Sequence, residues 1–120
     1  MKGHCLCGGV TFEAARVSRT SACHCSMCRR VSGHVWASGV VADDDLTIEG
    51  EVRWFASSEK AERGFCPTCG AALFWRLIGG DHVAVALGAL DSPTGLTLQR
   101  HIYTVDKGDY YEIADGLPQS

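Results

Sequence analysis

The chain has 120 residues and a mass of 12.9 kDa, the usual size of one folded domain, so we expect residues 1–120 to form a single domain. Hydrophobic residues make up 46% of it and charged residues 21%, a composition that excludes an intrinsically disordered chain. A net charge of −3 argues against a nucleic-acid partner. No apolar stretch approaches the ~20 residues of a membrane span, and the N-terminus lacks the apolar run of a secretion signal. We therefore expect a cytoplasmic protein with no membrane partner.

Local sequence patterns predict a fold built from strands. Alternating apolar and polar residues, or runs of β-branched and aromatic residues, are typical of strands. In chain order, the predicted strands are residues 10–13, 34–41, 46–49, 52–55, 72–78, 82–87 and 96–105. Gly50 and Glu51 are expected to form a two-residue turn between two of them, and Gly79-Gly80-Asp81 is a strong hairpin signal. Only residues 26–31 favour a helical turn, so the predicted fold class is mainly β, with antiparallel sheets and zinc knuckles at loop ends.

The most distinctive feature of the sequence is its cysteine content. There are seven cysteines, and a secreted disulfide framework would use an even number. Thiols two or three positions apart can converge on one metal ion, because a tight turn aims the sulfur atoms together and frees backbone N–H groups to bond them. In a reducing compartment this pattern predicts zinc. The closely spaced groups are Cys5 and Cys7; Cys23, Cys25 and Cys28; and Cys66 and Cys69.

Seven ligands suit two zinc ions, since a closed structural site takes four protein ligands and an open catalytic site takes three. Spacing leaves two partitions open and favours the second only modestly. The pair Cys66 and Cys69 is completed either by Cys25 and Cys28, as in a zinc ribbon, or by Cys5 and Cys7. The second partition leaves a local group of three, Cys23, Cys25 and Cys28, which we call the cysteine trio.

The expected chemistry of the cysteine trio is thiol activation. Three thiolates on Zn²⁺ leave one formal negative charge, so such a site activates water weakly and favours a soft thiol as its fourth ligand. Delivery of that thiolate to a carbonyl carbon gives a hemithioacetal, so the expected partners are a small-molecule aldehyde and a thiol, with the trio as the catalytic residues. Two alternatives stay open. One is a second structural zinc completed by a histidine or by a partner's ligand, and the other is a non-catalytic redox or metal-buffering module.

Other side chains could assist this chemistry. The imidazoles available as a general acid are His24, His34 and His101, and the side chain of His24 is expected to point away from the metal. Taken singly, His101 is more typical of a surface or strand-end position. A thiol such as glutathione carries two carboxylates, and the candidate contacts for them are Arg29, Arg30, Lys60, Arg63 and Arg100. A nucleic-acid-binding module would need a longer basic stripe than Arg29-Arg30.

Four ordered motifs carry a family resemblance that spans nearly the whole chain. They are CLCGGV at residues 5–10, CHCSMCR at 23–29, GFCPTCG at 64–70, and an ending with RHIY at 100–103 and DGLP at 115–118. Together they resemble the glutathione-dependent formaldehyde-activating enzyme (GFA) family, which is related to centromere protein V through the CENP-V/GFA domain. The resemblance implies a β-tent fold shared with methionine sulfoxide reductase B. It also implies S-(hydroxymethyl)glutathione synthesis from formaldehyde and glutathione, a carbon–sulfur lyase reaction.

The same resemblance implies two zinc ions per chain and assigns their ligands. The structural zinc is implied on Cys5, Cys7, Cys66 and Cys69. The catalytic zinc is implied on Cys23, Cys25 and Cys28.

Overall fold

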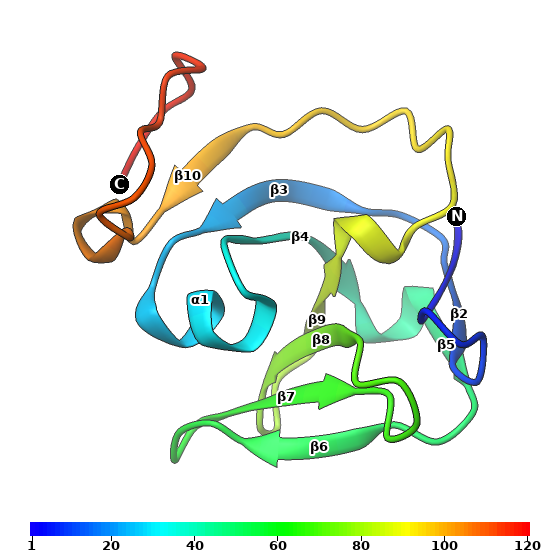
Figure 1. The fold of residues 1–120 in the computed structure, drawn as a ribbon. Helices are drawn as coiled ribbons and strands as arrows, with labels where there is room; N and C mark the ends of the chain where they lie inside the picture. Colours follow the sequence, from blue (N-terminus) through cyan, green and yellow to red (C-terminus); the bar gives the residue numbers. More distant parts are fainter.

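The computed structural model describes residues 1–120, which form two β-sheets and one short α-helix (Figure 1). The smaller sheet has three strands in the order β1-β2-β5, all antiparallel. These strands are β1 (Lys2–His4), β2 (Thr11–Ala14) and β5 (Leu46–Glu49). The smaller sheet therefore joins the N-terminus to the middle of the chain.

The larger sheet has seven strands in the order β10-β3-β4-β9-β8-β7-β6. Its neighbours are antiparallel, except that β10 runs parallel to β3. The strands are β3 (Ser18–Cys23), β4 (Trp36–Ala42), β6 (Arg53–Ala56), β7 (Ala61–Phe65), β8 (Ala72–Leu77), β9 (His82–Ala86) and β10 (Arg100–Ile102). The helix α1 (Ser26–Ser32) connects β3 to β4, and the 3₁₀ turns are η1 (Asp43–Asp45), η2 (Leu87–Ala89) and η3 (Thr104–Asp106).

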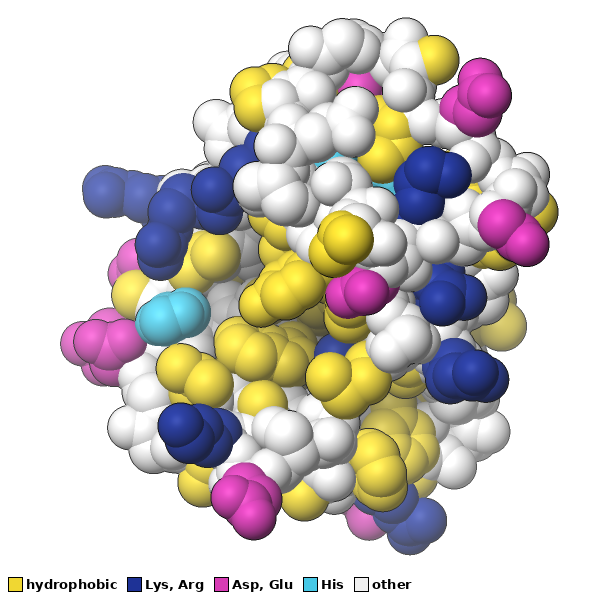
Figure 2. All heavy atoms as spheres, turned by 90° about the vertical axis from the view of Figure 1, so that its left-hand side faces the viewer, with side chains coloured by type: hydrophobic (Ala, Val, Ile, Leu, Met, Phe, Trp, Pro, Cys, Tyr) yellow, Lys and Arg dark blue, Asp and Glu magenta, His cyan; other side chains and the backbone are white.

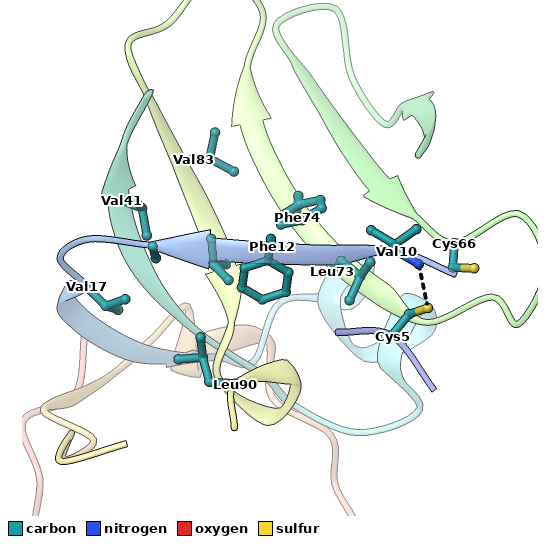
Figure 3. Packing of buried hydrophobic residues seen from close by; sticks show 12 residues of the cluster. Cys5, Val10, Phe12, Val17, Val41, Cys66, Leu73, Phe74, Val83 and Leu90 are labelled. Atoms are coloured by element: carbon teal, nitrogen blue, oxygen red, sulfur yellow. Dashed lines mark hydrogen bonds between the residues drawn. The ribbon is translucent and has the colours of Figure 1, made fainter. Parts of the chain in front are cut away.

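The main core joins the two sheets. Phe12 on β2 meets Phe74 on β8 edge to face, with ring centroids 5.3 Å apart. Figure 3 shows these rings among the valine and leucine side chains of the core, with Cys5 and Cys66 at one end of it. Because two cysteines belong to the core itself, any metal that they bind also holds the smaller sheet against the larger one.

The prediction of a mainly β fold is confirmed, and most predicted strands lie within two residues of observed ones. The helical turn is confirmed as α1, and the Gly79 hairpin joins β8 to β9 as predicted. The prediction that Gly50 and Glu51 form a two-residue turn between paired strands is wrong, because β5 pairs with β2 whereas β6 pairs with β7. Gly50 has φ +95°, and a Cβ there would overlap the carbonyl oxygen of Gly9, so the chain turns tightly against residue 9 and crosses between sheets.

The long strand predicted at residues 96–105 is also wrong, because only Arg100–Ile102 forms a strand there. Before β10, side-chain bonds replace the backbone ladder. Thr20 gives its N–H to the side chain of Gln99 and its hydroxyl proton to the carbonyl of Thr97. The parallel pairing of β10 with β3 departs from the prediction of antiparallel sheets, and it brings Ile102 opposite Cys23. No helix in the structure combines the length and apolar character that crossing a membrane requires.

Candidate metal centres

Four cysteines from two distant turns meet at one point. Cys5 and Cys7 lie in the turn after β1, and Cys66 and Cys69 lie in the turn between β7 and β8. Their four sulfur atoms lie within 4.8 Å of one another. The Sγ atom of Cys7 is 3.6 Å from that of Cys5 and 3.7 Å from that of Cys66. This four-cysteine cluster has the ligand number and type of a closed zinc site.

Backbone N–H groups aim at the sulfur atoms of this cluster, as the knuckle spacing predicts. Positive φ angles at Gly8 and Gly70 turn the backbone so that its N–H groups face inward. The N–H···S contacts run from Gly9 to Cys7 (3.4 Å), from Val10 to Cys5 (3.3 Å) and from Cys69 to Cys66 (3.5 Å). Such bonds stabilise thiolates rather than thiols, because an N–H donor interacts most strongly with a negative acceptor.

The thiols of the four-cysteine cluster cannot all ionise beside one another without a cation. Against the effect of burial, the N–H of Val10 and the neighbouring thiols lower the pKa of Cys5 to about 6. The N–H of Gly9 acts to lower the pKa of Cys7, but the neighbouring thiols of Cys5 and Cys66 outweigh it and raise this pKa to about 11. The rise at Cys7 is the repulsion expected between thiolates in contact. A divalent cation removes that repulsion, so these residues fit a bound Zn²⁺.

The cysteine trio forms where β3 ends and α1 begins. Cys23 is the last residue of β3, Cys25 is the N-cap of α1, and Cys28 lies in the first turn of the helix. Their sulfur atoms also lie within 4.8 Å of one another. The Sγ atom of Cys25 accepts the N–H of Cys28 at 3.3 Å, so this ligand candidate also caps the helix. Cys23 and Cys28 are buried, whereas Cys25 is half-buried.

A buried arginine faces the cysteine trio. Nη1 of Arg63, on β7, lies 3.6 Å from Sγ of Cys28, and the residue is only 8% exposed. No carboxylate pairs with Arg63, and its Nε is buried without a hydrogen-bond partner. A buried guanidinium is costly unless a negative group faces it. The arrangement therefore requires negative charge on the trio, which suits metal-bound thiolates.

The pKa shifts of the trio thiols also indicate negative charge on the trio. The neighbouring Cys23 thiol and the positive charge of Arg63 lower the pKa of Cys28 to about 6, against the effect of burial. Contact with Cys28 and burial raise the pKa of Cys23. As in the four-cysteine cluster, only a cation at the centre permits all three sulfur atoms to be thiolates. Arg63, one of the sequence-based candidates for a contact to a substrate carboxylate, is thus buried against a sulfur atom of the trio.

A chain of hydrogen bonds runs from the loop of the trio to the C-terminal segment. Nδ1 of His24 lies 2.6 Å from the hydroxyl of Tyr111, and its Nε2 lies 2.8 Å from Nδ1 of His101. Nε2 of His101 lies 2.7 Å from a carboxylate oxygen of Asp115. His101 is hydrogen-bonded through both ring nitrogens, but at 7% exposed it lies in β10 away from the surface, so the surface part of its predicted surface or strand-end position is wrong. His24 is 2% exposed and both its ring nitrogens are bonded in this chain, which leaves neither for a trio metal.

One arrangement of protons satisfies the whole chain. Asp115 accepts from Nε2 of His101, and hydrogen bonding with His101 lowers the pKa of that carboxyl group. Nδ1 of His101 then accepts from Nε2 of His24, and Nδ1 of His24 accepts from the hydroxyl of Tyr111. Burial lowers the pKa of His24, so the ring is neutral as this arrangement requires. The network fixes the loop that carries Cys23 and Cys25.

The other candidate residues lie at or near the surface. His34 is exposed, and its Nδ1 lies 2.8 Å from the hydroxyl of Tyr110. Arg29 is half-buried, with its Nε lacking a partner. The exposed ones are Arg30, Lys60 and Arg100. Figure 2, which views the side of the molecule where α1 lies in Figure 1, shows hydrophobic side chains around a hollow, with Lys and Arg side chains at its margins.

A cavity lined mostly by hydrophobic residues lies beside the trio rather than on it. Its volume is about 730 Å³, and 12 of its 17 lining residues are hydrophobic. None of the trio cysteines lines it, but Trp36, Ala72 and Ala86 belong both to its wall and to the hydrophobic cluster around Cys23 and Cys28. No lysine or arginine lines it, so carboxylate contacts must come from elsewhere.

The fold and the two clusters define a small, mainly β protein with seven cysteines arranged to hold metal ions. The family model described as glutathione-dependent formaldehyde-activating enzyme matches residues 1–106, so the chain belongs to this family. A Schizosaccharomyces pombe protein named as an uncharacterized lyase is 27% identical over 117 residues, covering 95% of this chain and 85% of that protein. The crystal structure of a Rhodobacter sphaeroides protein superposes with a TM-score of 0.65 at 22% identity, with both chains covered completely, and shows the same fold.

Sequence reasoning missed two residues of the hydrogen-bonded network, Tyr111 and Asp115, as functional candidates. Asp115 lies in the DGLP motif, so the motif pattern already contained a signal for it. Tyr111 lies outside the four motifs, and only the fold of the C-terminal segment brings it to His24. The inward direction of Arg63 was also missed, because an arginine between Glu62 and Gly64 has the local pattern of an exposed strand residue.

Proposed function

We propose that the protein is a zinc-dependent enzyme of the carbon–sulfur lyase type that reversibly adds a thiol to an aldehyde. The observation that carries the proposal is the cysteine trio, with three converging sulfur atoms and a buried arginine as its counter-charge. The family assignment and the lyase-named yeast relative support the same class of reaction. S-(hydroxymethyl)glutathione synthesis is the specific form that the family description suggests.

The two clusters take different roles in this proposal. The four-cysteine cluster holds a structural zinc, because four thiolates complete its coordination. Cys23, Cys25 and Cys28 hold the second ion, which when bound would supply an open position that takes up a thiol and promotes its ionisation. A β-tent architecture, a single domain over residues 1–120 and a cytoplasmic location belong to the same proposal.

The reaction balances without a redox partner. The substrate thiol loses its proton to solvent, and its sulfur attacks the carbonyl carbon of the aldehyde. The C–S bond forms as the π electrons of the carbonyl move to oxygen, and the resulting alkoxide takes a proton from solvent. Cys25, half-buried beside two buried ligand candidates, marks the side from which substrate can approach. Hydrolysis suits the site less well, since three thiolates make the metal a weak activator of water.

Glutathione is the thiol that the family description suggests, and its carboxylates need cationic partners. The half-buried Arg29 follows Cys28 directly on α1, and its Nε has no partner within the protein. We include Arg29 and the adjacent, exposed Arg30 as contacts for those carboxylates. The apolar cavity behind Trp36 contributes no such contact.

The variant Cys25→Ser tests the proposal. Serine is a good N-cap, so this change removes one sulfur ligand while retaining the capping interaction of α1. We expect bound zinc to fall from about two ions per chain to about one, and hemithioacetal formation from formaldehyde and glutathione to be lost. The matched control is Ser26→Ala at the adjacent exposed position. Full activity in Cys25→Ser would refute the mechanism.

The alternative is a non-catalytic or redox module, favoured by the closeness of the trio thiols and by the accessible Cys25. A redox role predicts that the trio oxidises and reduces reversibly while the four-cysteine cluster keeps its metal. Mass spectrometry of alkylated cysteines after mild peroxide treatment distinguishes it from the enzyme. Reversible oxidation without any aldehyde–thiol activity would favour the module.

A further inference from the structure

We propose that Arg63 is a catalytic residue that donates a hydrogen bond to the substrate oxygen as negative charge develops on it. This inference rests on the proposed addition of a thiol to an aldehyde. Arg63 is more than nine-tenths buried, beside the trio, and only one of its nitrogen atoms has a protein partner. That partner is the sulfur of Cys28, so the remaining N–H groups lie next to the place where the reaction would occur.

The strand register explains why Arg63 has no carboxylate partner. In β7, side chains alternate between the two faces of the sheet. Glu62 therefore points to the opposite face, where its carboxylate binds Nε of Arg76 at 2.7 Å. Arg63 points to the face that carries Cys28, flanked by Trp75 on β8 and Phe55 on β6 in the register of the sheet. The acidic side chain adjacent to Arg63 in the sequence is thus committed to another arginine.

The guanidinium group of Arg63 has N–H donors that bind no acceptor within the protein. A guanidinium group has five N–H donors in one plane, and the only hydrogen bond of this group within the protein is from Nη1 to Cys28. Its Nε is buried without an acceptor. Buried donors without partners are rare in proteins, and such a donor beside a reactive centre suits an acceptor that arrives with the substrate.

Charge favours the same role. A zinc ion with three thiolates is formally −1, and Arg63 makes this centre neutral before substrate binds. An incoming thiolate adds one negative charge, and this charge moves to the carbonyl oxygen as the C–S bond forms beside the buried Arg63. A fixed guanidinium there stabilises the developing charge without reorganisation, which is the usual basis of oxyanion stabilisation. Lysine would supply the charge but not the planar set of donors that can contact sulfur and oxygen together.

Three variants of Arg63 and one control variant test this role. Arg63→Lys keeps the charge and Arg63→Met removes it, whereas Arg53→Met removes an exposed arginine from the neighbouring strand β6. With about two zinc ions still bound, we expect kcat to fall about 10²–10³-fold in both Arg63→Lys and Arg63→Met, with KM changed much less. Guanidinium ion added to Arg63→Ala should restore part of the activity. Wild-type kcat in zinc-loaded Arg63→Met, or a loss of kcat that only follows a loss of zinc, would overturn the proposal.

A binding measurement separates this inference from the proposed function. Mercaptoacetate carries a thiol and an anionic oxygen, whereas ethanethiol carries only the thiol. We expect zinc-loaded wild-type protein to bind mercaptoacetate more tightly, and Arg63→Met to lose about 10–100-fold of that preference, the usual worth of a hydrogen bond to a charged group. Calorimetry measures the binding of both thiols without any turnover. An unchanged preference would refute the role of Arg63, whereas inactivity of wild-type protein towards aldehydes would refute the proposed function instead.

Discussion

Nε2 of His24 lies 2.8 Å from Nδ1 of His101, although 77 residues separate them in the chain. His24 stands between two cysteines of the trio, and His101 is the central residue of β10. The contact therefore links the loop that carries the trio to the parallel edge strand and to the C-terminal segment behind it. The last strand and the segment that follows it are thus part of the site's support.

The hydroxyl of Tyr111 is expected to contribute to stability through this network. In Tyr111→Phe, Nδ1 of the buried His24 loses its donor, so we expect the free energy of unfolding to fall by about 1–3 kcal/mol. Tyr110→Phe is the matched control, because the hydroxyl of Tyr110 bonds an exposed histidine and its loss should cost about 0.5 kcal/mol or less. Urea unfolding of both variants checks this. Equal effects would contradict the network.

Asp115 gives the network a pH dependence. Hydrogen bonding with His101 lowers the pKa of Asp115 in the folded state below its ordinary value of 3.8. The ionised carboxylate therefore stabilises the fold above that value, and this contribution is lost as the pH falls through the lowered folded-state pKa. We expect Asp115→Asn to be less stable than wild type at pH 6–7 and the difference to shrink below pH 3.8. A difference that is constant with pH would argue against this role.

Metal removal is expected to affect the two clusters differently. The four-cysteine cluster ties the turn after β1 to the turn before β8, and structural zinc supplies ~10–16 kcal/mol of apparent binding energy, as much as a small domain's whole stability. We expect Cys66→Ser or strong chelation to lower Tm sharply, and Cys25→Ser to lower it by only a few degrees. Thermal unfolding followed by circular dichroism checks both. An unchanged Tm in metal-free protein would remove the structural role of the zinc.

Gly50 is expected to tolerate no side chain. Gly50→Ala would combine an unfavourable φ with a clash against the backbone of Gly9, so we expect a loss of about 2 kcal/mol or more. Gly88→Ala is the control, because nothing lies near a Cβ at that position. Denaturant unfolding of both variants gives the comparison. A destabilisation of Gly50→Ala no larger than that of Gly88→Ala would show that the crossing between sheets does not depend on this glycine.

Much of the fold could be predicted because its strands carry local patterns. The alternation at Leu46–Glu49 predicts β5 with its observed bounds. β3 (Ser18–Cys23) and β7 (Ala61–Phe65) were missed, since their polar and small residues show no alternation that marks a buried face. Their inward positions are set by neighbours in the sheet, which local sequence does not encode.

The candidate site, like the fold, could be predicted from the sequence only in part. Close spacing brings Cys23, Cys25 and Cys28 together within one turn, so the trio could be recognised from the sequence. Spacing alone could not choose the partner of the Cys66 and Cys69 pair, because that choice depends on how β1 lies against the larger sheet. The roles of Arg63 and Tyr111 depend on contacts over 35 and 87 residues, and no short-range pattern reports those.

The number of zinc ions per chain tests the central claim most directly. Native mass spectrometry of protein purified without chelator should give about two ions per wild-type chain and about one for Cys25→Ser. In the wild type, the three trio thiols should also resist alkylation until the metal is removed. About one ion per wild-type chain, with Cys23, Cys25 and Cys28 open to alkylation, would contradict a metal-dependent thiol-activating site.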